Sequence, residues 1–242
     1  MKILLAGLGF IDGDINYNKN VIINTIKKYN NVDIIVFGEA FLQGFNAVKF
    51  KYEDDVNVAV SINDDVINEI TKTVKEYQVG ISFGYFEKDN DSIYSSQLTI
   101  DKNGCIIDNY RRVSEGWKEK YADEHYKEGR SFKPFDFLGK KFIVALCGDL
   151  WYDENIDIIE NIDTDIVLWP VYTDFISYQW NSLIKYEYAG RVQALYRDVL
   201  FVNSYKLNGS EEEAKGGCCQ FNNDEIIKES PSGKEDVLLV II

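Results

Sequence analysis

The chain has 242 residues, of which 45% are apolar and 27% charged, and 40 acidic against 26 basic side chains give a formal charge of −14. These proportions are typical of a globular protein and exclude a largely disordered chain. No apolar run reaches the roughly 18 residues of a membrane span, and the negative charge disfavours broad binding to nucleic acid or membranes. The first residues lack the small-residue cleavage site of a signal peptide, so none is expected.

The cysteines give little sign of disulfides or of a metal site. Cys105, Cys147, Cys218 and Cys219 show no C-x-x-C spacing, and the last two are adjacent and poorly placed to bridge each other. Reduced thiols and a cytoplasmic protein are therefore expected. The sole histidine, His125, cannot complete a closed ligand set with scattered cysteines, so neither a metal nor another cofactor is expected.

Strands and helices are predicted to alternate at the start of the chain. Residues 2–9 form a short apolar run typical of a buried strand, and residues 18–29 carry apolar side chains at helical spacing. Residues 33–37 predict a second strand, buried on both faces, and residues 64–77 predict a second amphipathic helix.

The middle of the chain predicts a hairpin and a long loop. Residues 79–86, 92–100 and 105–110 favour strands, and the turn sequence DKNG at 101–104 joins the last two. Residues 114–130 are polar, aromatic and charged without clear periodicity, so we predict a loop with one helical turn at most.

The second half predicts further strands at 141–146, 165–169, 199–204, 216–221 and 237–242. A short helix is predicted over 155–161 and a long one over 178–196. Alternation favours an α/β fold, and the late strands need antiparallel partners, so the sheets should be mixed. No linker rich in Pro, Gly or Ser divides the chain, which indicates one domain over residues 1–242.

A carboxylate, Glu39, directly follows the second predicted strand in the segment FGEAFLQGF of residues 37–45. The carboxyl ends of strands in α/β sheets are common places for sites. Apolar neighbours would raise the pKa of Glu39 toward that of a general base. A solvated loop glutamate is the alternative interpretation.

A cysteine, Cys147, ends another predicted strand in the segment VALCGDLW of residues 144–151. Gly148 would permit a sharp turn that presents Cys147 as a nucleophile, and the Gly148 backbone N–H could serve an oxyanion. The alternative is a small buried side chain, as free cysteines often are.

Basic residues flanked by aromatic ones follow the predicted hairpin in the segment NYRRVSEGWK of residues 109–118. Their side chains could hold an anion or polarise a carbonyl group. A solvated basic turn is the alternative, since long charged side chains usually stay in water.

Taken in order, these segments resemble the signatures of the carbon–nitrogen hydrolase (nitrilase) superfamily. Residues 37–45 resemble the first signature. The turn at 101–104 followed by Tyr-Arg-Arg at 110–112 resembles the second, and Cys-Gly-Asp-Leu at 147–150 with Glu154 resembles the third. Each motif is weak alone, but their order and spacing make the resemblance strong.

Further elements of the superfamily are matched downstream, so the resemblance covers almost the whole chain. Residues 165–170 resemble its strand ending in Pro, residues 191–203 its helix followed by a strand ending in Asn, and Gly-Gly-Cys at 216–218 its Gly-Gly-Ser element.

The resemblance implies a four-layer α-β-β-α sandwich with two mixed β-sheets. It implies a hydrolase of non-peptide carbon–nitrogen bonds in small amides, carbamoyl amides or nitriles, and a homodimer or larger homo-oligomer. Glu39 would take the proton of Cys147, which would form a thioester or thioimidate. Arg112 and the Gly148 N–H would hold the oxyanion, and water activated by Glu39 would release the acid.

The resemblance also implies a second glutamate between the basic residue and the cysteine. Glu124 matches best, while Glu115, Glu119 and Glu128 remain alternatives. Trp151 and Tyr172 are candidate substrate-binding residues among the aromatic residues near the site segments. The tryptophans and tyrosines there could equally belong to the core or to a subunit interface.

Arg112 departs from the superfamily, which has Lys at this position. Because an arginine is a poor proton donor, three interpretations stay open: Lys118 enters from the same loop, Arg112 acts as an electrostatic clamp, or the chain retains binding without hydrolysis. A Cys147–His125 dyad and a thiol redox protein using Cys147 or the Cys218–Cys219 pair are further alternatives.

Overall fold

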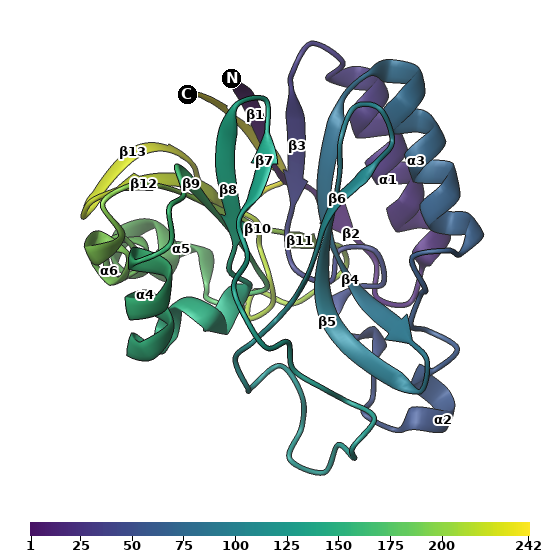
Figure 1. Ribbon diagram of the computed structural model, residues 1–242. Coiled ribbons are helices and arrows are strands. Elements are labelled where there is room, and N and C mark those ends of the chain that lie inside the picture. The colour runs from purple at the N-terminus through teal and green to yellow at the C-terminus, as the bar shows by residue number, and fades with distance from the viewer.

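The computed structural model describes residues 1–242 and contains two six-stranded sheets packed face to face (Figure 1). The first has the order β14 (Asp236–Ile241), β1 (Lys2–Gly7), β3 (Ile34–Phe37), β4 (Gly80–Asp89), β5 (Ser92–Ile100) and β6 (Ile106–Arg111). The second has the order β13 (Glu225–Ser230), β12 (Cys218–Asn222), β10 (Asp198–Asn203), β9 (Ile166–Val171), β8 (Lys140–Val144) and β7 (Phe135–Phe137).

Helices cover the outer face of each sheet. The main helices α1 (Ile15–Lys28) and α3 (Asp65–Tyr77) lie over the first sheet, and α4 (Asp153–Glu160), α5 (Ser177–Gln179) and α6 (Lys185–Arg191) lie over the second (Figure 1). Each sheet has parallel strands at its centre and antiparallel strands toward its edges. The predicted α-β-β-α sandwich with two mixed sheets is therefore confirmed.

Side chains that alternate along β3 pack into two different cores. Ile34 and Val36 belong to a cluster of 35 buried residues that contains side chains from both sheets. Ile35 and Phe37 belong to a second cluster of 20 buried residues beneath α1 and α3. The prediction that this strand is buried on both faces is confirmed, and burial of its apolar surface on each side stabilises the sandwich.

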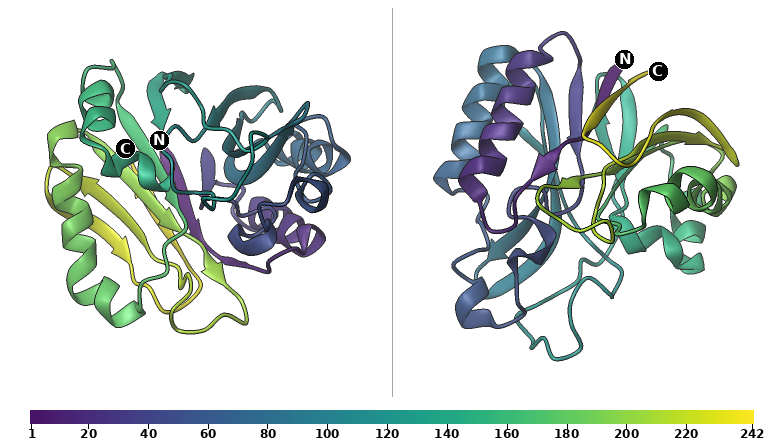
Figure 2. Two further views of the ribbon diagram at one scale, coloured as in Figure 1. Left: turned by 90° about the horizontal axis from the view of Figure 1, so that it is seen from below. Right: turned by 180° about the vertical axis from the view of Figure 1, so that it is seen from behind.

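The first and last strands of the chain are neighbours. β1 and β14 pair antiparallel, with Lys2 opposite Ile241, so the two termini lie side by side in each view of Figure 2. Two short strands, β2 (Gly9–Phe10) and β11 (Tyr205–Lys206), form a separate ladder.

Several element boundaries differ from those predicted. The helix predicted from residue 18 begins at Ile15, because the Asp14 carboxylate accepts a hydrogen bond from the Tyr17 N–H and caps the helix. The long helix predicted over 178–196 contains a π-helical segment, Trp180–Ile184, between α5 and α6. The strands β7, β11 and β13 were not predicted, since they are short or, as in β13, mostly exposed and polar.

The predicted loop over residues 114–130 is confirmed, and it contains no helical turn. Trp117 and Tyr126 anchor it in a small third cluster that also holds Ala40. The Tyr126 Oη donates to Asp55 Oδ2 (2.7 Å) at the end of α2 (Tyr52–Asp55). Tertiary packing thus orders this loop, and it lies against the turn that carries Glu39. No helix of the protein combines the length and apolar character needed to cross a bilayer.

Candidate active site

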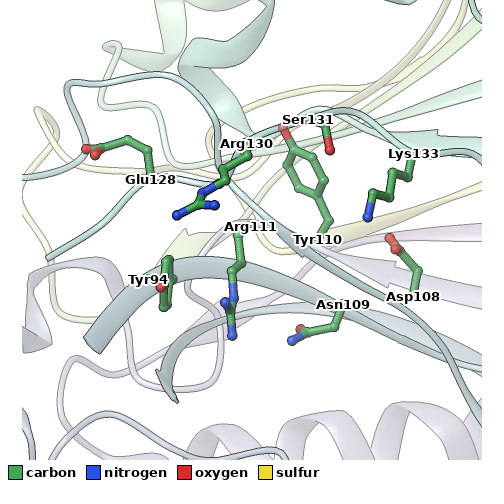
Figure 3. A pocket seen from close by; sticks show the side chains of 10 residues that line it. Tyr94, Asp108, Asn109, Tyr110, Arg111, Glu128, Arg130, Ser131 and Lys133 are labelled. Atoms are coloured by element: carbon green, nitrogen blue, oxygen red, sulfur yellow. The ribbon is translucent and has the colours of Figure 1, made fainter. Parts of the chain in front are cut away.

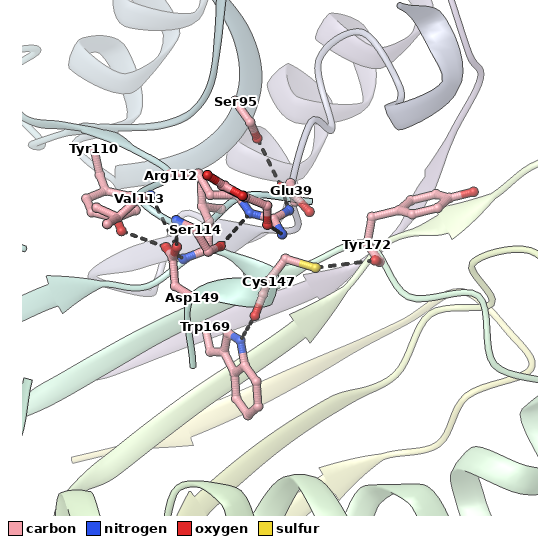
Figure 4. Close-up of polar contacts among 12 residues, drawn as sticks. Glu39, Ser95, Tyr110, Arg112, Val113, Ser114, Cys147, Asp149, Trp169 and Tyr172 are labelled. Carbon is pink, nitrogen blue, oxygen red and sulfur yellow. Dashed lines mark hydrogen bonds and ion pairs between the residues drawn. The ribbon is translucent and has the colours of Figure 1, made fainter. Parts of the chain in front are cut away.

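Three strand ends bring Glu39, Arg112 and Cys147 together between the sheets (Figure 4). Glu39 follows β3 and Arg112 follows β6, both in the first sheet, whereas Cys147 follows β8 in the second. The site therefore exists only when the two sheets pack against each other.

Glu39 is buried, and both of its neighbours in sequence are held close to the sheets. Its N–H donates to the carbonyl oxygen of Val171 in the second sheet (3.2 Å). Its Oε1 accepts from Ser95 Oγ and from Arg112 Nη1, each at 3.0 Å, while Oε2 has no hydrogen-bond partner. One carboxylate oxygen is thus fixed and the other is available to a proton.

A glycine in β4 makes room for the Glu39 turn. A Cβ atom on Gly84 would lie 2.3 Å from the Ala40 nitrogen, so a larger residue would displace the turn. Ala40 itself has a positive φ of 49°. This turn is held in place by close backbone contact.

Arg112 is buried, and each of its three guanidinium nitrogens donates one hydrogen bond. Besides Nη1 with Glu39, its Nε donates to Ser114 Oγ (2.9 Å) and its Nη2 to the Glu115 carbonyl oxygen (3.4 Å). The planar fork therefore fixes the charge beside Glu39 with a geometry that an ammonium group cannot reproduce.

Gly148 is required by the position of this guanidinium. A Cβ on Gly148 would lie 2.3 Å from Arg112 Nη2 and 3.2 Å from Ser114 Oγ. The left-handed residue of the turn is Cys147, with a φ of 42°, whereas the sequence interpretation assigned the turn to Gly148. Glycine thus provides close approach, and the candidate nucleophile carries the unusual backbone conformation.

Cys147 is half-buried, and its thiol contacts the Tyr172 carbonyl oxygen at 3.6 Å. Its own carbonyl oxygen accepts from Trp169 Nε1 (2.9 Å). Burial, together with the adjacent negative charge of Glu39, raises the pKa of Cys147 to about 12, and the charge of Arg112 opposes this shift. The resting thiol is therefore protonated at neutral pH, and a nucleophilic role needs a base.

Asp149 ties the ends of β6 and β8 together, a role that sequence reasoning missed. Its carboxylate is fully buried. It accepts four hydrogen bonds, from Tyr110 Oη (2.6 Å), Ser114 N (2.7 Å), Leu146 N (2.8 Å) and Val113 N (3.2 Å). The segments on either side carry Arg112 and Cys147, so Asp149 sets their separation. The sequence did contain a signal for this role, because Asp149 is a carboxylate within an apolar segment and a buried carboxylate needs hydrogen-bond donors.

The other predicted site residues lie elsewhere. Lys118 Nζ donates to the Tyr126 carbonyl oxygen and pairs with Glu128, each at 2.7 Å, within its own loop. Glu124 is exposed, and neither it nor the exposed carboxylates of Glu115 and Glu119 is among the hydrogen-bond partners of the Glu39 side chain.

The aromatic candidates lie around the cysteine. Trp151 is 44% exposed and meets Tyr188 edge to face. Tyr172 stacks on Phe45, and its hydroxyl accepts from Asn46 Nδ2 (3.1 Å), so its carbonyl oxygen rather than its ring meets the thiol.

Apart from Cys147 itself, the residues of the dyad and redox interpretations take no part in this arrangement. His125 stacks on Tyr52 and bonds to Asp123 in the loop. All four cysteines are free, with Cys218 and Cys219 buried in β12.

The sequence matches a known protein family. The family model for carbon–nitrogen hydrolases matches residues 13–192, which include Glu39, Arg112 and Cys147. The chain belongs to the carbon–nitrogen hydrolase family.

Two curated relatives of this carbon–nitrogen hydrolase have names that indicate carbamoyl compounds as substrates. A citrullinase from Francisella tularensis is 29% identical over 126 residues, covering 50% of this chain and 42% of the relative. An N-carbamoylputrescine amidase from Arabidopsis thaliana is 28% identical over 144 residues, covering 57% and 47%. The matched region spans less than half the length of each relative.

Solved structures share the fold. A Nesterenkonia amidase of the nitrilase superfamily superposes with a TM-score of 0.80 at 14% identity, covering 99% of this chain and 89% of that one. In another structure of that amidase, the acetamide moiety of fluoroacetamide is covalently added at the active-site cysteine. At this identity the likeness concerns the fold alone.

Proposed function

We propose that the protein hydrolyses a small amide or carbamoyl amide through a thioester on Cys147, with Glu39 as general base. The observation that carries this proposal is the unpartnered Oε2 of Glu39 next to a protonated thiol. A base with one oxygen fixed and one open suits transfer of the thiol proton.

In the first half-reaction, the Cys147 sulfur attacks the carbonyl carbon while its proton moves to Glu39. The Gly148 N–H and the Arg112 guanidinium stabilise the oxyanion that develops. Collapse of this intermediate breaks the carbon–nitrogen bond, and the leaving nitrogen takes the proton held by Glu39. Ammonia or an amine departs, and the thioester remains.

In the second half-reaction, Glu39 takes a proton from water as the hydroxyl oxygen attacks the thioester carbon. Collapse breaks the carbon–sulfur bond, and the thiolate recovers its proton from Glu39. Glu39 thus carries the proton in both directions, so Arg112 needs to supply only charge. This removes the need for a lysine as proton donor.

Carbamoyl compounds and simple amides are favoured as substrates because the curated relatives include a citrullinase and an N-carbamoylputrescine amidase. A nitrile would react through the same sulfur to a thioimidate. The second candidate function is a small-molecule binder without turnover, favoured by the Arg112–Glu39 ion pair (3.0 Å), which occupies one oxygen of the base.

The test combines ammonia release with intact-protein mass after exposure to acetamide, propionamide, citrulline, acetonitrile and fluoroacetamide. An acyl adduct or released ammonia is expected from the parent and not from Cys147→Ala. Glu39→Gln should slow adduct formation at least about a hundredfold. Cys105→Ala, which removes an exposed thiol, is the matched control. Bound compound without adduct or ammonia would instead establish the binder.

We also propose that the chain is one unit and that it forms a homo-oligomer in a reducing compartment such as the cytoplasm. Exposed apolar side chains on the helices over the second sheet support an interface, namely Ile158 (50%), Leu183 (61%), Tyr186 (57%) and Tyr178 (79%). Sedimentation of the parent and of Leu183→Glu tests this. A monomeric parent would contradict the oligomer.

A further inference from the structure

A polar cavity of about 380 Å³ lies at the edge of the first sheet, between β6 and the segment of residues 128–133 (Figure 3). Charged side chains dominate its lining, and Glu39, Arg112 and Cys147 are not among the lining residues. The cavity is therefore distinct from the candidate active site and from the function proposed for it.

A carboxylate without a partner lies in this cavity. Asp108, on β6, has a buried Oδ2 that makes no hydrogen bond. Burial raises the pKa of Asp108 to about 7, against the opposing effects of a backbone hydrogen bond at Asn109 and the charge of Lys133. An unpaired buried acceptor of this kind is unfavourable unless something else satisfies it.

Two cations that line the cavity have no salt-bridge partner, and the charge of one of them, Lys133, acts on Asp108. Arg130 and Lys133 are exposed and form no ion pair within 4.0 Å. Arg111 differs, because its guanidinium pairs with Glu87 and Asp89 and lies 3.9 Å from the centre of the Tyr94 ring. Figure 3 shows Lys133 on the same side as Asp108 and Arg130 on the other side of the cavity.

We propose that this cavity binds a small zwitterion, whose ammonium group meets Asp108 and whose carboxylate meets Arg130 on the opposite side. A simple anion would bring a second negative charge near Asp108, and a simple amine would leave Arg130 unpaired. A molecule carrying both charges on a short chain satisfies both ends.

The cavity wall is joined to the candidate active site through the backbone. The Gly129 N–H donates to the Arg112 carbonyl oxygen (2.7 Å), and a Cβ on Gly129 would lie 2.1 Å from the Arg111 carbonyl oxygen. A ligand that fixes residues 128–133 therefore also fixes the backbone that carries Arg112.

The experiment is calorimetric titration of the full chain carrying Cys147→Ala, which prevents consumption of any ligand and keeps the test independent of the proposed hydrolysis. The probes are L-alanine, β-alanine and L-glutamine, with acetate and methylammonium as compounds bearing one charge each. At least one amino acid should bind about tenfold more tightly than either singly charged probe.

Asp108→Asn and Arg130→Gln should each weaken that binding about tenfold, because each removes one charge-assisted contact. Asp91→Asn and Lys72→Gln, exposed residues elsewhere, are the matched controls and should leave it unchanged. Arg130 is exposed, so its variant tests the site without risk to folding.

Three results would overturn the zwitterion site. They are absence of binding by all three amino acids up to about 10 mM, equal binding of acetate, and unchanged binding in both Asp108→Asn and Arg130→Gln. Binding of methylammonium that appears only in Lys133→Gln would show that Lys133 itself neutralises Asp108, which also contradicts the proposal.

Discussion

Arg112 supplies positive charge to the candidate site and fixes the positions of the groups around it. Its guanidinium contacts Glu39, Ser114 and the Glu115 carbonyl oxygen, and it is 4% exposed. The resemblance to the family identified Arg112 as a departure from the expected lysine. Only the packed structure shows that all three guanidinium nitrogens donate hydrogen bonds.

We expect Arg112→Met to lower the free energy of unfolding by about 3–5 kcal/mol, because it leaves the buried Glu39 carboxylate without its counter-ion. Arg112→Lys should cost less, about 1–3 kcal/mol, since it keeps a charge and loses the bond to Ser114. Urea unfolding followed by tryptophan fluorescence measures both. Equal stability of the two variants would contradict this account.

Asp108 makes stability depend on pH in the direction opposite to that of a salt-bridged carboxylate. Burial raises the pKa of Asp108 in the folded state to about 7, above its ordinary value of 3.8, so the folded state keeps a proton that the unfolded state loses. The free energy of unfolding should therefore fall as pH rises from about 4 to about 7. Asp108→Asn should stabilise the protein by about 1–3 kcal/mol at pH 8.

The gain from Asp108→Asn should be about half as large at pH 5.5 as at pH 8, because the free-energy cost of the buried carboxyl grows with pH between its unfolded and folded pKa values, and pH 5.5 lies about midway between them. Urea titrations at the two pH values measure the difference. Asp91→Asn is the control, and a gain independent of pH would show that Asp108 is not desolvated.

At the scale of elements, the site depends on how strand ends meet. The turn after β8 places Gly148 against Arg112, which comes from the end of β6 in the other sheet. The Cβ atom added by Gly148→Ala would overlap the Arg112 guanidinium. Because other hydrogen bonds hold the guanidinium, the substitution should strain the site and shift both groups from their present positions. We expect a 10- to 100-fold slower reaction of Cys147 with fluoroacetamide, since small displacements at reacting groups are costly.

Gly190→Ala provides the matched control for this substitution. Gly190 lies in α6, where an added Cβ meets no atom within 4 Å. This variant should react at the parent rate and gain roughly 0.5–1 kcal/mol in stability, because alanine favours the helix. The adduct rates come from intact-protein mass, and similar slowing in both variants would contradict the proposed contact.

The sequence predicted the elements with strong periodicity. The runs that became β3, β5 and α3 were each found close to their observed bounds, since their apolar patterns match a buried strand or a helix facing the core. The π-helical segment Trp180–Ile184 and the packing that anchors the predicted loop of residues 114–130 were not foreseen, because both depend on contacts with distant segments.

At the scale of the whole molecule, one core joins the two sheets. Ile34 and Val36 of the first sheet share a 35-residue cluster with side chains of β8, β9 and β10. We expect a single unfolding transition, with the same urea midpoint by far-ultraviolet circular dichroism and by tryptophan fluorescence. Val36→Ala should shift both midpoints together through a loss of about 2 kcal/mol. Separate midpoints would indicate that the halves unfold independently.

The sequence by itself determined the layered α/β class, the strand ends that carry Glu39, Arg112 and Cys147, and a resemblance to the family that the comparisons then showed. Hydrophobic periodicity and short motifs are local properties, so they can be read without knowing the fold. Only the tertiary structure decided which charges meet. In the folded protein, Arg112 pairs with Glu39 and Lys118 pairs with Glu128. Asp149 links the two sheets, and Asp108 has no partner in its cavity. These contacts join residues far apart in sequence, and burial and Coulomb energy depend on distances that no local pattern encodes.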